Sequence, residues 1–253
     1  MIFINKPVTV PPKLMEFKTA MTDSIGTYGC FESIPEEELK TFIKGYRHVE
    51  VKEVLFNCGH QKCSYCEAIP IGSRLRVDHF FPKKLYPELT LDWDNLLPSC
   101  ENCNTRKSSH NTKIEPIINP SKIDPIPYYE FDNIWMIPAE YSPDPVLTKR
   151  TIEVCDLNRR ELLNSRANLL LDLSEYQKDI NNVLIDLETP MSDLKIKNRI
   201  IRLEESFDII EEMAGDTEKF SAFIKKFLEK SIYIQDVKSQ FTNIKKKHEE
   251  LII

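Results

Sequence analysis

Two short stretches decide how this chain folds: Cys63-Ser-Tyr-Cys66 and Cys100-Glu-Asn-Cys103. Each C-x-x-C turn presents two thiolates on one side of the backbone, and two such turns complete a tetrahedral site for one zinc ion. Because four cysteines leave no position open to water, the role of such an ion is structural. The 33 residues between the turns are more than a compact zinc ribbon holds, so we expect a substantial insertion between them.

The remaining cysteines do not extend this pattern. Cys58 and His60 lie close enough to the first turn to replace one of its ligands, although the two cysteines of that turn suffice. Cys30 and Cys155 have no neighbours of the metal-binding type, and we expect both to be buried. The odd total of seven cysteines argues against a disulfide framework.

The insertion carries polar residues of the kinds that do chemistry. Its alternating segment Arg74-Leu-Arg-Val-Asp78-His79 predicts a strand that ends before Pro82. Further on, Asp94-Asn95-Leu-Leu leads into the second cysteine turn. The sequence therefore places Asp78, His79 and Asn95 between the two halves of the zinc site.

Three more polar residues follow the second cysteine turn directly: Asn104, Arg106 and Lys107. We expect Ser99 to cap a helix that begins at this turn. Asn104 and Lys107 would then share one helix face, at positions i and i+3.

The order Asp-His, then Trp-Asp-Asn-Leu-Leu, then Cys-x-x-Cys-Asn-x-Arg-Lys resembles the HNH family of ββα-metal nucleases in its zinc-stapled form. The resemblance implies a two-stranded ribbon followed by a helix across one metal ion. It implies that His79 is the general base, and that Asp78 and Asn104 bind the catalytic metal ion. Asn95 resembles the middle asparagine, which orients the histidine and its loop. Asn104 stands where the family name has its last histidine, a choice that many members share.

These residue types suit the hydrolysis of a phosphodiester. A neutral imidazole near pH 7 can take the proton of the attacking water. A hard divalent ion such as Mg2+ or Mn2+, held by carboxylate and amide oxygens, keeps positions open for phosphate oxygens. Arg106 and Lys107 are candidates for binding neighbouring phosphates. His110 is a weaker candidate for the site, because a surface position explains it as well.

A longer series of motifs narrows the resemblance. It runs from Cys63-Ser-Tyr-Cys66-Glu67 through Asp78-His79-Phe-Phe-Pro-Lys83 and Leu91-Asp-Trp-Asp-Asn95 to Leu157-Asn158-Arg159. This order is similar to the nuclease subunit of Septu-type anti-phage systems, which some retrons also use as an effector. The resemblance implies a partner, an ATPase of the ABC/SMC-like type, and a DNA-cleaving effector within a defence complex.

A shift in composition marks a boundary near residue 148. Fifteen of the sixteen prolines lie at or before Pro145, so the first part is irregular and the second nearly all helical. We expect an α+β protein: a scaffold segment over residues 1–57 that packs on the core, a zinc-bound nuclease domain over 58–147 that ends in a proline-rich strap, and a mainly α-helical domain over 148–253.

The helical part carries apolar residues at intervals of three and four, which predict helices over 163–187, 196–214 and 220–234. Packing within a helical bundle explains these stripes most simply. Docking of the partner is the sharper interpretation, and it requires that an apolar stripe stays exposed.

Net charge and hydropathy limit the classes of function that the chain can have. The net charge of −6 argues against a general polyanion binder, but basic residues outnumber acidic ones over 58–114. We expect a cytoplasmic protein, because no secretory signal and no apolar run of membrane-spanning length is evident.

The favoured function is a DNA endonuclease. The alternatives are a nuclease that cleaves RNA, such as tRNA, and a non-catalytic zinc scaffold that binds nucleic acid or protein.

Overall fold

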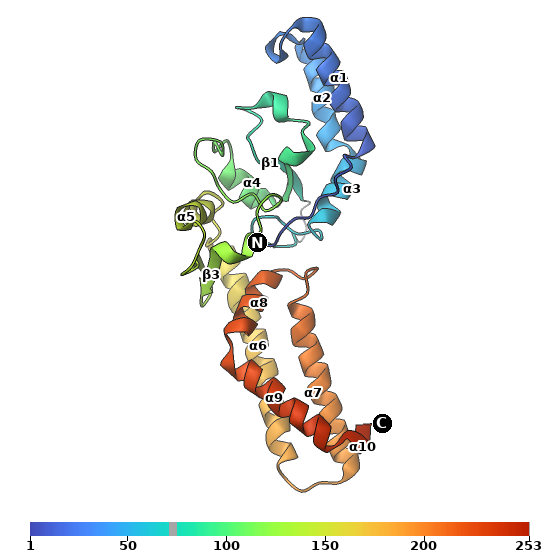
Figure 1. The fold of residues 1–253 in the computed structure, drawn as a ribbon, viewed down its shortest axis with the longest axis vertical. Helices are drawn as coiled ribbons and strands as arrows, with labels where there is room; N and C mark the ends of the chain where they lie inside the picture. The colour runs from blue at the N-terminus through green and yellow to red at the C-terminus, as the bar shows by residue number, and fades with distance from the viewer. Residues whose placement is uncertain (71–74, 253) are drawn as a thin grey trace. The chain divides into compact units, whose positions relative to one another are not determined.

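The computed structural model describes residues 1–70 and 75–252, which divide into two compact units, Met1–Arg159 and Arg160–Ile253. Figure 1 shows their helices and strands in chain order. The first unit contains α1 (Pro12–Tyr28), η1 (Phe31–Ser33), α2 (Glu36–Arg47), α3 (Val49–Cys58), β1 (Arg76–His79), η2 (Pro87–Leu89), η3 (Trp93–Asn95), β2 (Leu96–Ser99), α4 (Glu101–Lys107), η4 (Ile126–Tyr128), β3 (Tyr129–Asp132), β4 (Trp135–Pro138) and α5 (Pro145–Val154).

The N-terminal helices α1, α2 and α3 pack on the strands through a shared apolar core. Pro12 opens α1, and three glutamates occupy the first turn of α2, where the helix dipole favours negative charge. Gly45 of α2 allows a close approach, because a Cβ there would lie 2.7 Å from Cβ of Phe17 in α1. The core that joins these helices to the strand segment consists of Leu14, Met21, Ile34, Phe42, Tyr46, Val51, Leu55, Leu91, Trp93 and Leu96.

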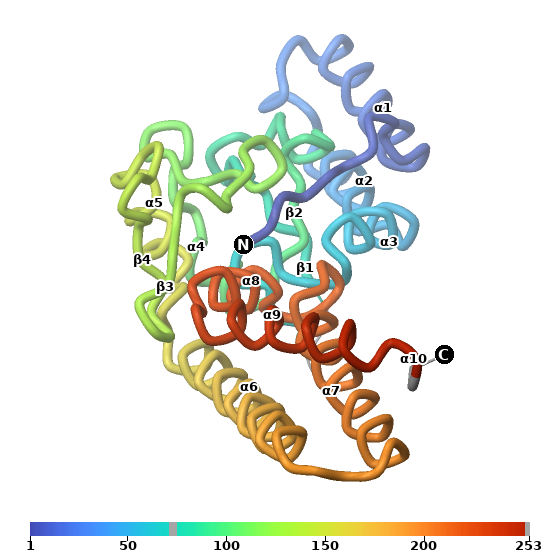
Figure 2. Tube along the Cα trace, turned by 60° about the horizontal axis from the view of Figure 1, so that its bottom comes forward, coloured from blue at the N-terminus to red at the C-terminus, as the bar shows by residue number. Residues whose placement is uncertain are grey.

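Strands β1 and β2 form an antiparallel ribbon, and the chain passes from β2 into α4 (Figure 2). Asp78 pairs with Leu97 and His79 with Leu96, so the Asp-His pair ends the first strand. Arg74, where we expected the strand to start, lies outside the described residues, and β1 begins at Arg76. The predicted α+β class with a ββα core is confirmed.

The start of α4 differs from the expectation. Cys100 is its N-cap, and the Cys100 sulfur accepts a hydrogen bond from the backbone N–H of Cys103 at 3.4 Å. Ser99, the predicted cap, is the buried last residue of β2. A thiolate can serve as metal ligand and helix cap at once, which removes the need for a serine cap.

The proline-rich strap is ordered and leads into α5. It contains the β3–β4 hairpin, in which Tyr129 pairs with Pro138. The hydroxyl of Thr151 in α5 accepts a hydrogen bond from the N–H of Ile118 at 2.8 Å. Helix α5 therefore belongs to the first unit, and the compact units divide after Arg159 rather than at residue 148.

Over the described residues, all regular secondary structure of the second unit is helical. This unit contains α6 (Arg160–Leu187), α7 (Asp193–Met213), α8 (Ser221–Lys230), α9 (Ile232–Lys247) and α10 (Glu249–Ile252). The long helices α6 and α7 run antiparallel (Figure 1), and Arg199 bonds Asp186 across them at 2.8 Å. The single helix that we predicted over 220–234 is divided into α8 and α9. The division lies at Ser231, whose hydroxyl caps α9 by accepting a hydrogen bond from the N–H of Ile234. Within the described range, no helix combines the length and the apolar character needed to cross a membrane.

Candidate active site and metal centre

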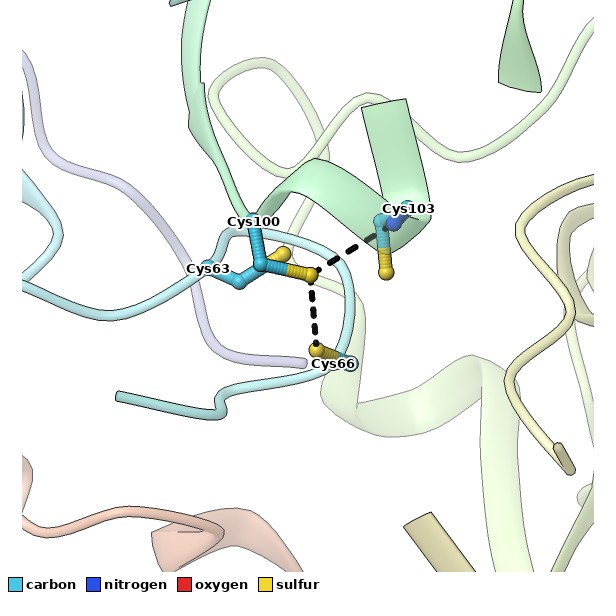
Figure 3. A group of neighbouring side chains, drawn as sticks. All are labelled: Cys63, Cys66, Cys100 and Cys103. Atoms are coloured by element: carbon cyan, nitrogen blue, oxygen red, sulfur yellow. Dashed lines mark hydrogen bonds between the residues drawn. The ribbon is translucent and has the colours of Figure 1, made fainter. Parts of the chain in front are cut away.

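The four predicted zinc ligands meet at one point (Figure 3). Cys63 and Cys66 come from the loop after α3, Cys100 from the end of β2 and Cys103 from α4. Their sulfur atoms all lie within 4.8 Å of one another, and those of Cys66 and Cys100 are 3.8 Å apart. A zinc ion about 2.3 Å from each sulfur requires edges of about 3.8 Å. The buried cluster therefore fits a tetrahedral metal ion, and a cation there offsets the burial that raises the pKa of the Cys63 thiol.

Arg159 completes the surroundings of the cysteine cluster, a role that the sequence did not reveal. Its guanidinium donates to the sulfurs of Cys103 at 3.4 Å, Cys66 at 3.6 Å and Cys100 at 3.8 Å. Burial opposes the charge of Arg159, but the negative charge on Cys103 and Cys66 raises its pKa above the ordinary value. A zinc ion with four thiolates carries a net negative charge, which this guanidinium balances.

The other cysteines stay outside the cluster. Cys58 donates its S–H to the carbonyl of Val54 within its own helix, and neither it nor His60 belongs to the group of candidate ligands among the described residues. Cys155 is buried as expected. Cys30 is exposed, contrary to the expectation, because it lies in the surface turn that follows α1.

Asp78 is buried, and two side chains fix its carboxylate. The Tyr65 hydroxyl donates to Oδ2 at 2.7 Å, and the Lys107 ammonium donates to Oδ1 at 3.2 Å. Lys107 also donates to the carbonyl of His79 at 2.7 Å, so one amine ties the Asp-His pair to α4. Each carboxylate oxygen keeps a second lone pair, which a divalent ion can use.

His79 is held in one tautomer. Its Nε2 lies 3.1 Å from the carbonyl oxygen of Thr90, and because a carbonyl only accepts, Nε2 carries the proton. Nδ1 is then the basic nitrogen. Burial, opposed by the charge of Asp78, lowers the pKa of His79 to about 4, so the imidazole is neutral at pH 7.

Asn95 closes the loop that follows His79. Its side-chain oxygen accepts from the N–H of Phe81 at 2.7 Å, and its amide donates to the carbonyls of Phe81 and Leu89, each at 3.1 Å. Three hydrogen bonds from one buried amide fix the loop that runs from the histidine to Thr90, which positions the imidazole.

The residues of α4 divide between the site and the surface. Asn104 is half-buried and lies one helical turn before Lys107. Lys107 is only 1% exposed and bonds Asp78, so it does not present its charge to a substrate phosphate as we expected. Arg106 is exposed and pairs with Asp156 at 3.3 Å, and the His110 ring contacts the carbonyl of Glu115 at 2.8 Å.

A cleft of about 760 Å³ opens beside this arrangement. Asn104 and Val77 line it from the ββα core, while α2 and α3 supply the facing residues. Tyr46 of α2 lines the cleft and places its ring edge-on against His79, with ring centroids 4.7 Å apart. Helices α2 and α3, whose role the sequence left open, thus form one wall of the cleft, and Tyr46 of this wall contacts the candidate base.

Comparison with known proteins agrees with this geometry. The family model described as HNH endonuclease matches residues 63–110. The chain is 36% identical to a Septu protein PtuB of Bacillus thuringiensis over 115 residues, a match that covers 45% of this chain and 43% of that protein. It is 28% identical to a Septu protein PtuB of Bacillus mycoides over 230 residues, covering 76% of this chain and 72% of the relative.

The matched segment contains both cysteine turns, the Asp-His pair, the ribbon and the whole of helix α4 that follows it. Sequence and geometry therefore agree that residues 63–110 form an HNH endonuclease domain, the domain of a nuclease that hydrolyses phosphodiesters, in a chain that is similar to the two Septu PtuB proteins.

Proposed function

We propose that this protein is a metal-dependent endonuclease that cleaves DNA as the effector of an anti-phage defence complex. The observation that carries the proposal is the pair Asp78 and His79 at the end of β1, with the carboxylate fixed by Tyr65 and Lys107 and a neutral imidazole whose Nδ1 is basic. A fixed carboxylate beside a neutral base is what hydrolysis of a phosphodiester requires.

In the proposed reaction, Nδ1 of His79 takes a proton from a water molecule as the water oxygen bonds to phosphorus. The bond between phosphorus and the leaving oxygen breaks, and that oxygen takes a proton from solvent. Asp78 and Asn104 would hold a Mg2+ or Mn2+ ion, which supplies positive charge to the phosphate oxygens and the leaving group when bound. Asn95 keeps the histidine loop in place.

We assign the four-cysteine cluster to a structural zinc ion. Four thiolates with a matching sulfur–sulfur edge favour zinc, and the closed ligand set leaves no position for a substrate. The ion would join the loop after α3 to the start of α4, and so fix Lys107 and Asn104 relative to β1.

The similarity to the two PtuB proteins supports a proposal about the partner and the place of action. We propose that an ABC/SMC-like ATPase of the same Septu- or retron-type system controls the nuclease. The second unit supports this idea because it exposes Leu171 and Ile185 on α6 and Leu194 on α7. We place the complex in the cytoplasm, where a reducing environment keeps cysteines available for metal.

The test is a cleavage assay on the full chain, alone and with the proposed ATPase partner. Supercoiled plasmid and total RNA are mixed with Mg2+ and either wild type or His79→Ala, with His110→Ala as the matched histidine control. We expect loss of supercoiled plasmid with wild type and His110→Ala, and none with His79→Ala.

Cuts in RNA alone that depend on His79 would keep the active site and change the substrate to RNA. Cleavage that persists in His79→Ala, or no cleavage in any mixture even with a phage lysate added, would contradict the proposal and favour a zinc scaffold.

A further inference from the structure

The cleft contains cations that the proposed hydrolysis does not use. Arg47, Lys52, Arg76 and Lys83 line it together with the acidic residues Glu53 and Glu101. Arg76 is neutralised by Glu101 at 2.7 Å. Over the described parts of the chain, neither Arg47 nor Lys83 forms an ion pair with a carboxylate. The side of the cleft near α2 is therefore left with uncompensated positive charge.

Tyr46 binds both of these cations, Arg47 and Lys83. Its buried hydroxyl accepts a hydrogen bond from Nζ of Lys83 at 3.0 Å and from Nε of Arg47 at 3.1 Å. Both cations also lie near its ring, with Lys83 Nζ at 5.3 Å and Arg47 Cζ at 5.5 Å from the centroid. Burial opposes ionisation of Tyr46, yet these hydrogen bonds lower its pKa. Arg47 from α2 and Lys83 from the loop after β1 are thus held at the same hydroxyl group.

The same tyrosine connects this point to the candidate base. The Tyr46 ring stands edge-on to His79 at 4.7 Å, so the two cations lie about one side chain away from the imidazole. The Nε of Arg47 is engaged by Tyr46, which leaves its two Nη groups for a bidentate contact with phosphate oxygens.

We propose that Arg47 and Lys83, held by Tyr46, form a phosphate-binding subsite for the backbone of the nucleic acid that is cut at His79. The inference rests on the proposed function and adds two substrate contacts to it: Lys83 within the HNH domain, and Arg47 from a helix outside that domain. The subsite binds the phosphate beside the scissile one, and Tyr46 acts as a positioning residue that holds both cations next to the base.

The test measures binding apart from cleavage. Fluorescence anisotropy follows a labelled DNA strand of about 20 nucleotides, and the matching RNA, with the full chain and no Mg2+ added. The variants are Arg47→Gln and Lys83→Gln. Their matched controls are Lys44→Gln on the same helix and Lys84→Gln beside Lys83, which remove the same charge outside the cleft lining. All four side chains are exposed, so folding is not at stake.

We expect Arg47→Gln and Lys83→Gln each to weaken binding about three- to tenfold at low salt. Each should also lower the slope of log Kd against log salt concentration by about one, because one phosphate contact is lost. The control variants should bind as wild type does. Tyr46→Phe, which keeps the ring against His79 but removes the acceptor, should weaken binding in the same direction.

Equal binding by wild type, Arg47→Gln and Lys83→Gln would overturn the subsite. So would an equal loss of binding in the Lys44→Gln and Lys84→Gln controls, because that outcome indicates a diffuse charge effect. The proposed function fails separately, through the absence of His79-dependent cleavage. If Arg47→Gln and Lys83→Gln bind nucleic acid more weakly than wild type, while the wild-type protein cuts neither DNA nor RNA, the subsite stands and the nuclease is rejected.

Discussion

At the scale of single residues, the site depends on how Asp78 and His79 are buried. A carboxylate without partners would be costly in this environment, and Tyr65 and Lys107 offset that cost with two hydrogen bonds. The imidazole of His79, in contrast, is uncharged, because burial lowers its pKa. One short segment therefore presents a charged ligand and a neutral base side by side.

The pKa of His79 predicts how cleavage depends on pH. Because its folded-state pKa is about 4 against an ordinary value of 6.5, the base stays neutral well below pH 6.5. We expect single-turnover cleavage rates that vary little between pH 5.5 and 8 and fall only as pH approaches 4. A bound metal ion shifts this midpoint further down, in the same direction. A midpoint near pH 6.5 would show that the histidine is solvated rather than buried.

The same shift predicts a change in stability. The unfolded chain binds a proton at His79 between pH 6.5 and about 4, whereas the folded chain does not. The free energy of unfolding should therefore fall as pH is lowered through this window. Urea denaturation of wild type and His79→Gln at several pH values measures the difference, which should shrink toward acid pH.

Lys107 and Arg106 are adjacent basic residues whose replacement should cost very different amounts of stability. Lys107→Met leaves the buried carboxylate of Asp78 without its cation, so we expect the free energy of unfolding to fall by about 3 kcal/mol. Arg106→Met breaks only a surface pair with Asp156 and should cost less than about 1 kcal/mol. Chemical denaturation without added Mg2+ compares the two, and equal losses would contradict the buried pair.

At the scale of elements, α2 and α4 bring the site together. Helix α4 starts at a metal ligand, Cys100, and ends at Lys107, so the thiolate cluster and Asp78 are joined through one short helix. Helix α2 presents Tyr46 to His79, and its position depends on a close approach to α1.

Gly45 makes that approach possible, which gives a prediction with an internal control. A side chain at position 45 would meet Phe17 at 2.7 Å and Leu91 at 3.0 Å, so Gly45→Val should destabilise the protein by about 1–3 kcal/mol. Gly26 in α1 has no atom within 4 Å of an added Cβ, and Gly26→Ala should stabilise by about 0.5–1 kcal/mol. Guanidinium denaturation should give changes of opposite sign, and a tolerated Gly45→Val would contradict the packing.

At the scale of the whole molecule, the chain consists of an α+β unit that contains the entire candidate site and a helical unit. The division after Arg159 gives a prediction about truncation. A chain of residues 1–159 should keep one zinc ion, because Arg159 and α5 remain.

A chain that ends at residue 147 lacks that guanidinium and most of α5, and should lose zinc on gel filtration. Elemental analysis by mass spectrometry, with the full chain as reference, measures the zinc content. Equal zinc retention by the two truncated chains would place the boundary nearer residue 148.

The sequence by itself determined the ββα core and the four thiolate ligands. Their signal is local: two C-x-x-C turns, an alternating strand that ends in Asp78-His79, and an asparagine directly after Cys103. Such short spacings translate into geometry without knowledge of distant contacts, because turns and short strands have few conformations. The helical character of the second unit follows in the same way from apolar spacing and the scarcity of proline.

Only the tertiary structure decided which residues surround these groups. Arg159 reaches the cysteines from 56 residues beyond Cys103, and Tyr46 approaches His79 from a helix outside the matched domain. Lys107 reads as a surface cation in sequence, yet it is enclosed by packing that brings α4 against β1. Burial and long-range contacts depend on how all elements pack together, and no local pattern records them.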